Sequence, residues 1–248
     1  MREKERDELM LGIDQFSLAF QPIVKVSEKG HTIEAYEILL RYQDGDSFPF
    51  EIFEKAINSK ECCDHLNAWY EQQIMACLET YPETKFSLNI DFQQLVYVST
   101  WDLLKSLSQY QGRMNIELTE FYQVNNSDHR DVFLKAMNYI KELGMKISFD
   151  DVGNGQHSVA FVTENIQHVT SCKLSLLHFN HLEETTAAVF VDLWVKISAD
   201  FDIKLIVEGV EDKEMADMLT EKGVIYQQGF YWSKAIRLDY PIQNTICF

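Results

Sequence analysis

The alternation of apolar and polar positions predicts strands and helices that follow one another along the chain. Two alternating runs near the N-terminus, residues 16–26 and 32–42, are joined by a short turn-like sequence, so we expect them to form a hairpin. Apolar residues spaced by three and four follow over residues 49–81, and this spacing predicts helix.

Strand and helix patterns alternate through the rest of the chain. The predicted strands cover residues 85–90, 114–120, 145–151, 169–176, 203–211 and 224–232, and helical patterns separate most of them, at 100–110, 131–144, 186–201 and 212–223. This alternation is typical of an α/β protein with parallel strands and helical crossovers. About eight strands over this length favour a TIM (β/α)8 barrel over an open sheet, modified by an antiparallel first pair of strands.

The composition predicts one domain over residues 1–248, with residues 1–15 forming a charged helix before the barrel. The chain has 248 residues with only four prolines and ten glycines, and no Pro-rich or Ser/Gly-rich linker divides it. No apolar run reaches the roughly 18 residues of a membrane helix, and the charged N-terminus lacks a signal-peptide core. Five cysteines without CxxC spacing read as reduced, which agrees with a cytoplasmic protein.

A formal net charge of −17 limits the partners of this chain. Such a surface repels nucleic acid polymers and anionic membranes, so neither is an expected partner. An anionic ligand would need a locally positive site, supplied by metal ions or by well-placed Arg and Lys.

Oxygen-bearing side chains gather where the predicted strands end. Because the C-terminal strand ends of a barrel meet on one face, these side chains are expected to converge. Carboxylate and carboxamide oxygens suit Mg²⁺ or Mn²⁺, whereas zinc would call for His or Cys. The residues are Asn89, Glu117, Asp150, Asp151 and Glu208, with Glu37 on the second strand and Lys173 and Gln228 on later strands.

The adjacent acids Asp150 and Asp151 raise the question of what offsets their repulsion. Two cations roughly 3.5–4 Å apart would do so, and such pairs stabilise both the attacking and the leaving oxygen in phosphoryl displacement. The alternative is ordinary turn chemistry, with each acid a helix cap or a solvated loop residue. From the residues alone both interpretations stay open.

The remaining histidines and cysteines suggest no further site. Cys62, Cys63 and His65 lie in a helical pattern, which favours packing cysteines and a surface histidine. His178 and His181 have helical spacing but no third ligand, so we expect both on the surface.

Eight short motifs nevertheless occur in an order that is known from one family. They are QPIV, EILLR, LNI, IELTE, DDVGNG, CKLS, VEGVE and QQGF. With these motifs, from Phe20 to Ala235, the chain resembles the EAL family of bacterial phosphodiesterases, which linearise cyclic di-GMP. The family fold is a modified barrel with two antiparallel first strands, as the hairpin also suggests.

The resemblance implies a metal-dependent phosphodiesterase that opens cyclic di-GMP to linear pGpG by in-line attack of an activated water. It further implies a homodimer in bacterial second-messenger signalling, and leaves room for a regulatory protein partner. The resemblance also implies roles for single residues. The first cation would be bound by Glu37, Asn89, Glu117 and Asp150, and the second by Asp150, Asp151 and Glu208. Lys173 would orient the water, Gln228 would contact water and phosphate, the substrate would be contacted by Gln21, Leu39 and Arg41, and Glu120 would steady the DDVGNG loop.

Several positions depart from the family pattern. Ser175 stands where the family has the Asp of Lys-Ile-Asp, and Val152 and Asn154 replace Phe and Thr in the loop. No implied cation ligand is replaced, which favours an active enzyme. The alternative is a weak or inactive EAL-like domain that acts as a cyclic di-GMP receptor or a protein-interaction regulator.

Overall fold

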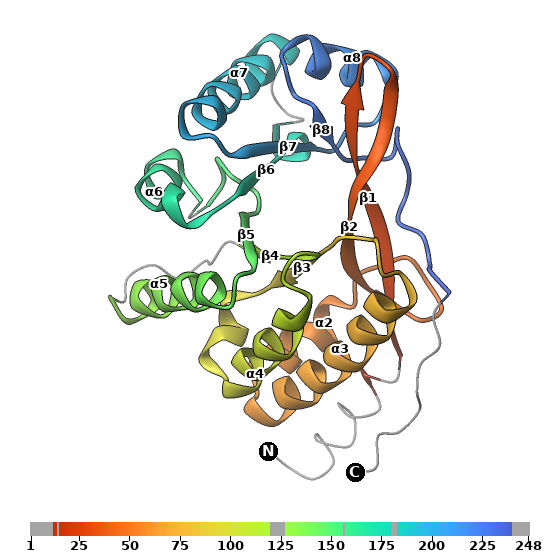
Figure 1. Ribbon diagram of the computed structural model, residues 1–248, viewed down its shortest axis with the longest axis vertical. Coiled ribbons are helices and arrows are strands. Elements are labelled where there is room, and N and C mark those ends of the chain that lie inside the picture. The colour runs from red at the N-terminus through yellow and green to blue at the C-terminus, as the bar shows by residue number, and fades with distance from the viewer. Residues whose placement is uncertain (1–11, 14, 120–126, 156, 180–182, 240–248) are drawn as a thin grey trace.

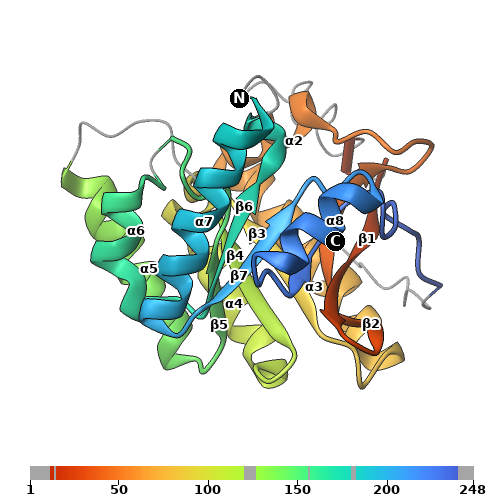
Figure 2. The same cartoon turned by 90° about the horizontal axis from the view of Figure 1, so that it is seen from above.

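The computed structural model describes residues 12–13, 15–119, 127–155, 157–179 and 183–239. Eight strands form a closed barrel in chain order, with helices around its outside (Figures 1 and 2). The strands are β1 (Phe16–Ser27), β2 (Gly30–Tyr42), β3 (Phe86–Ile90), β4 (Met114–Leu118), β5 (Lys146–Phe149), β6 (Ser171–Ser175), β7 (Lys204–Glu208) and β8 (Tyr226–Gln227).

Within the described residues, seven α-helices connect these strands, together with short 3-10 turns. The α-helices are α2 (Phe50–Ile57), α3 (Lys60–Thr80), α4 (Val98–Leu107), α5 (Ser127–Glu142), α6 (Val159–Asn165), α7 (Glu184–Phe201) and α8 (Lys213–Glu221). The 3-10 turns are η1 (Phe92–Val96), η2 (Ser108–Tyr110), η3 (Ile166–His168) and η4 (Leu176–Phe179). No helix among these residues is both long and apolar enough to cross a membrane.

The first pair of strands departs from a regular barrel, as the hairpin pattern predicted. β1 runs antiparallel to both of its neighbours, β2 and β8, whereas every other neighbouring pair is parallel. The hairpin places Gln21 opposite Glu37, with a register irregularity after Ile23. The predicted α/β barrel with an antiparallel first pair is therefore confirmed.

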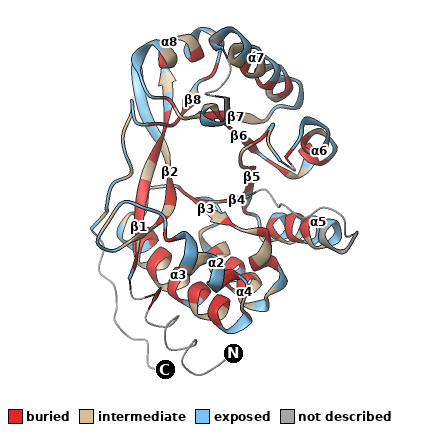
Figure 3. Ribbon diagram, turned by 180° about the vertical axis from the view of Figure 1, so that it is seen from behind, coloured by how far each residue is buried: buried red, intermediate tan, exposed pale blue. Residues whose placement is uncertain are grey.

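The apolar core lies between the strands and the inner faces of the helices. Helix α5 illustrates why: Phe133, Ala136, Met137 and Ile140 recur at helical spacing and are all buried. Phe133 packs on Phe149 of β5 with ring centroids 5.9 Å apart. Figure 3 shows buried residues along the strands and on the helix faces that pack against them.

Some predicted boundaries were wrong. The helical stretch 49–81 is two helices, because Asn58 ends α2 and Ser59 begins α3. Strand β5 stops at Phe149, so both aspartates lie in the loop that follows, and β8 is only two residues long. Helix α6, capped by the Ser158 side chain, was not predicted, because seven residues give too short a pattern.

Candidate active site

The predicted acids converge at the C-terminal end of the barrel around a single lysine. Lys173 of β6 is 1% exposed, and its ammonium lies within ion-pair distance of four carboxylates. The distances from Nζ are 3.1 Å to Glu37 Oε2, 2.6 Å to Glu117 Oε2, 3.4 Å to Asp150 Oδ1 and 2.5 Å to Glu208 Oε1. The structure thus brings together side chains from five different strands or strand ends.

The register of the parallel strands explains this convergence. Asn89 of β3 pairs with Glu117 of β4, so the two side chains lie at the same level of the barrel. On β2, Glu37, Leu39 and Arg41 alternate with buried Ile38 and Leu40, which places the first three on a common face. The strand register and the alternation along β2 therefore place these side chains at this end.

Two amides hold Glu37 in place. Asn89 Nδ2 donates to Glu37 Oε1 at 2.7 Å, and Gln228 Nε2 donates to Glu37 Oε2 at 2.6 Å. Gln228 Nε2, just after β8, also lies 3.4 Å from Gln21 Oε1 on β1. Each oxygen of Glu37 thus accepts a hydrogen bond from a neutral amide, and Oε2 also contacts the Lys173 ammonium.

The two aspartates lie in a tight loop with three residues in positive-φ conformations. Asp151 has a φ of 49°, and Gly153 and Gly155 have φ values of 89° and 45°. Only glycine adopts this region without strain, so the two glycines predicted for a tight turn are needed here. Val152, between Asp151 and Gly153, is 1% exposed, and the loop packs inward despite lacking the larger Phe of the family pattern.

Burial and neighbouring charge separate the pKa values of the two most buried acids. Burial raises the pKa of Glu117 to about 8; Lys173 opposes this rise, while Glu37 and Asp150 add to it. For Glu37 burial also acts upward, but Lys173 and the two amide donors outweigh it and hold its pKa below the usual range. Glu117 therefore binds a proton at neutral pH while Glu37 stays ionised.

Burial and neighbouring charges also shift the pKa values of Glu208 and Asp151. Burial raises the pKa of Glu208 well above its usual value, against the pull of Lys173. Burial and the neighbouring Asp150 raise the pKa of Asp151. The acids in turn raise the pKa of Lys173 despite its burial. One ammonium does not offset five desolvated carboxylates, so a bound cation would stabilise this end of the barrel.

Unused oxygens show that the donor set fits such a cation. Asn89 Oδ1 and Glu117 Oε1 are buried and accept no hydrogen bond from any described residue. Buried acceptors normally have a partner, and a hard divalent cation binds oxygens of these types. Ligand oxygens of Asp150, Asp151 and Glu208 also lie within 4.8 Å of one another, close enough to share an ion.

The residues expected to contact substrate lie on the hairpin beside the acids. Gln21 Nε2 donates to the Ser233 carbonyl at 3.2 Å, and Arg41 donates to the Leu40 carbonyl at 2.8 Å. Partial burial lowers the pKa of Arg41, and the nearby Arg237 adds to this effect. Leu39 is half-buried on the same face as Arg41.

Two histidines at this site were missed by sequence reasoning. His157 is fully buried, stacks on Phe149 at a centroid distance of 4.9 Å, and donates from Nδ1 to the Asp150 carbonyl at 2.5 Å. His178, expected to be a surface residue, is 42% exposed, but its Nε2 lies 3.0 Å from Asp151 Oδ1. Neither contact has a local signal, because each depends on how a loop returns to the strand ends.

Two predictions fall outside the described residues. Glu120, expected to steady the DDVGNG loop, is not described, and the predicted N-terminal helix is described only at residues 12, 13 and 15. Both stay predictions.

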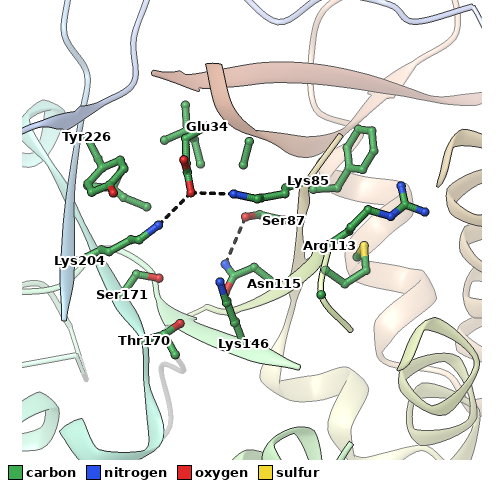
Figure 4. A pocket seen from close by; sticks show the side chains of 16 residues that line it. Glu34, Lys85, Ser87, Arg113, Asn115, Lys146, Thr170, Ser171, Lys204 and Tyr226 are labelled. Carbon is green, nitrogen blue, oxygen red and sulfur yellow. Dashed lines mark hydrogen bonds and ion pairs between the residues drawn. The ribbon is translucent and has the colours of Figure 1, made fainter. Parts of the chain in front are cut away.

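A second polar cluster lies at the opposite, N-terminal end of the strands (Figure 4). Glu34 accepts from Lys204 at 2.9 Å and from Lys85 at 3.1 Å, and Asn115 donates to Ser87 at 3.2 Å. These side chains line a cavity of about 80 Å³, large enough for a few waters. Glu34 is the one acid among the residues that line this cavity, whose basic residues are Lys85, Arg113, Lys146 and Lys204.

A sequence model of the EAL domain matches residues 6–235, and the chain belongs to the EAL domain family. The signaling protein YkoW of Bacillus subtilis (strain 168) is 25% identical over 235 residues, which are 90% of this chain and 28% of that protein. The "Probable cyclic di-GMP phosphodiesterase PdeN" of Escherichia coli (strain K12) is 25% identical over 253 residues, 96% of this chain and 47% of that protein. The chain thus spans less than half the length of these two relatives.

Solved structures support the same fold. BlrP1 of Klebsiella pneumoniae, solved as a manganese/cyclic di-GMP complex, has a TM-score of 0.72 and 22% identity over 90% of this chain and 56% of that one. An EAL domain protein from Listeria monocytogenes EGD-e has a TM-score of 0.68 and 21% identity over 95% of this chain and 94% of that one. The family and the barrel expected from the motifs are therefore both confirmed.

Proposed function

We propose that this chain is a phosphodiesterase that hydrolyses cyclic di-GMP to linear pGpG with two divalent cations, Mg²⁺ or Mn²⁺. The observation that carries the proposal is the buried cluster in which, among the described residues, Lys173 is the one cation within ion-pair distance of the four carboxylates, and the acceptor oxygens Asn89 Oδ1 and Glu117 Oε1 have no partner. Membership of the EAL family and a relative named for cyclic di-GMP hydrolysis support it.

In this proposal the acids divide between two cation positions. Glu37, Asn89, Glu117 and Asp150 hold the first cation; Asp150 also faces the second, with Asp151 and Glu208. When bound, the cations lower the pKa of a water and neutralise phosphate charge. They also bring an anionic substrate to a protein with a net charge of −17.

The protein's own side chains supply positioning. Lys173 orients the attacking water by donating a hydrogen bond, and Gln228 donates to water and to a phosphate oxygen. Arg41, whose guanidinium suits phosphate geometry, holds the substrate together with Gln21 and Leu39. We further propose that the enzyme acts in the cytoplasm as a homodimer, which sedimentation of the purified chain tests.

The proposal is tested by incubating the purified chain with cyclic di-GMP and either Mg²⁺ or Mn²⁺, and separating the products by chromatography. We expect pGpG to form, and to disappear with EDTA or with Glu37→Gln. Absence of pGpG from the wild-type chain under all of these conditions would overturn the enzyme assignment.

One observation favours a receptor as the second candidate. Ser175 pairs with Glu208 in the barrel register, so β6 ends in a hydroxyl beside that acid instead of a second carboxylate. Tight binding of cyclic di-GMP without product would establish the receptor, and Ser175→Asp would then be the first substitution to test for restored turnover.

A further inference from the structure

We propose that His178 is a positioning residue for Asp151, and that its hydrogen bond sets the affinity of the second cation position. Nε2 of His178 lies 3.0 Å from Asp151 Oδ1. The inference rests on the proposed function, because it assigns a task to a residue that the two-cation arrangement does not itself include.

The backbone of Asp151 is fixed while its side chain has little support. The residue has a φ of 49°, unfavourable for a residue with a Cβ, and its carbonyl accepts from the amide of Asn154 at 3.1 Å. The next amide, of Val152, donates to the Lys173 carbonyl at 3.0 Å. Among the described residues, His178 alone makes a hydrogen bond or ion pair with the Asp151 carboxylate.

The other acids of the cluster have buried partners. Glu37 has two amide donors, and Glu117 and Glu208 each contact the ammonium of Lys173. The Asp151 side chain is 31% exposed and its partner is 42% exposed. The orientation of this one carboxylate thus depends on a contact at the rim of the barrel.

The turn that carries His178 is anchored to the neighbouring strand end. It is part of η4, directly after β6, and Leu177 in the same turn packs against Gly209, the residue after Glu208. A Cβ at Gly209 would lie 2.9 Å from Leu177 Cγ and 3.3 Å from its backbone nitrogen. Because Gly209 has no side chain, the η4 turn can pack close to it, and from this position His178 reaches Asp151.

The chemistry of the contact suits positioning and not ligation. An imidazole N–H that donates to one carboxylate oxygen leaves the other oxygen and its lone pairs for a cation, and such partners of ligands typically change metal affinity by about 10- to 100-fold. The ligand atoms that lie within 4.8 Å of one another belong to Asp150, Asp151 and Glu208, without His178. The imidazole therefore acts on the second cation through Asp151.

The test is titration of the full, metal-free chain with Mn²⁺, with the free ion measured by electron paramagnetic resonance. We expect the wild type to bind two ions per chain. In His178→Ala we expect one ion to bind as in the wild type and the other to lose about 10- to 100-fold in affinity. His178→Gln, which keeps an N–H donor, should recover part of the loss.

Two controls separate positioning from a general structural effect. His65→Ala removes a histidine on α3 that bonds the Glu61 carbonyl, far along the chain from the cluster, and should leave both affinities unchanged. In an Asp151→Ala background, His178→Ala should have no further effect, because no side-chain oxygen is left to accept from Nε2.

Unchanged binding of both ions by His178→Ala would overturn the proposal, as would an equal loss at both positions or a full further loss in the Asp151→Ala background. These outcomes differ from failure of the proposed function, in which the wild-type chain itself binds no Mn²⁺ pair and forms no pGpG. A wild type that binds a single ion would overturn the role of His178 as well, since no second position would then exist.

Discussion

The two ends of the barrel present opposite arrangements of the same ionic groups. At the C-terminal end one lysine, Lys173, faces four carboxylates and is 1% exposed. At the N-terminal end one carboxylate, Glu34, lies between Lys85 and Lys204 (Figure 4), whose side chains are 46% and 41% exposed. One end holds an excess of buried acids, and the other holds a half-exposed excess of basic groups, with Glu34 against Lys85, Arg113, Lys146 and Lys204.

This difference makes the acidic end the candidate for binding cations. Exposed ion pairs contribute little to stability because water screens them. Buried, unbalanced carboxylates are costly unless a cation joins them. Substitutions at matching positions of the two ends should therefore differ strongly in their effects on the rate of hydrolysis and on the free energy of unfolding.

The largest contrast is expected between two glutamates three residues apart on β2. Glu37→Gln should lower the rate of cyclic di-GMP hydrolysis by about 10³-fold, because loss of a cation ligand removes several kcal/mol of charge stabilisation. Glu34→Gln, at the other end of the strand, should leave the rate within about twofold. Both rates are measured by chromatography of pGpG, and similar losses in the two variants would contradict the comparison.

The two lysines should differ in stability as well. Lys173→Met leaves its buried acids without an ammonium, and should lower the free energy of unfolding in EDTA by about 3 kcal/mol. Lys204→Met should lower it by less than about 1 kcal/mol. Denaturant titration measures both, and saturating Mn²⁺ should recover part of the loss in Lys173→Met only. Equal losses would mean that burial does not distinguish the two ends.

Cation binding should depend on pH at the acidic end. Glu117, with a pKa of about 8, must lose its proton to bind a cation, so apparent affinity for Mn²⁺ should rise by up to about tenfold per pH unit below that value. Calorimetry in buffers of different ionisation enthalpy should show proton release at pH 7. An affinity independent of pH between 6 and 8 would contradict the raised pKa.

The same raised pKa has a stability consequence. Because folding raises the pKa of Glu117, its protonated form stabilises the metal-free fold at low pH, and this contribution is lost as pH rises through about 8. The midpoint of thermal unfolding in EDTA should therefore fall as the pH rises from about 4.5 to about 8. This fall should be smaller with Mn²⁺.

The smallest effect on stability is expected for a substitution of Glu34 at the N-terminal end of the barrel. The neighbouring lysines hold the pKa of Glu34 below its usual value despite partial burial, so its ion pairs are present at neutral pH and lost only in acid. Glu34→Gln should change the free energy of unfolding by less than about 1 kcal/mol, and by even less at high salt. A change above about 2 kcal/mol would show that this cluster is structural to the barrel.

Much of the acidic end could be read from the sequence, because strand ends map directly to one face of a barrel. Asn89, Glu117 and Glu208 stand at or next to the ends of short apolar runs, and the structure brings them to one cluster as expected. The hairpin was likewise visible as two alternating runs joined by a turn. In these cases a local pattern determines the position of the side chain.

The rest depends on tertiary geometry that no local pattern encodes. Nothing in the letters around Asp151 signals its positive φ, since that conformation is more typical of glycine. The contact of His178 with Asp151 requires the η4 turn to fold back over the loop after β5. Helix α6 and strand β8 are too short for their periodicity to be recognised.

The reversed direction of β1 also decides where the polypeptide enters the barrel. In a regular barrel the first strand begins at the face remote from the chemistry. Here Phe16 lies opposite Tyr42 at the last residue of β2, so β1 begins at the end of the barrel that carries the acidic cluster and runs away from it. The described chain therefore enters the sheet next to the pair of Ser17 and Arg41, at the same end as that cluster.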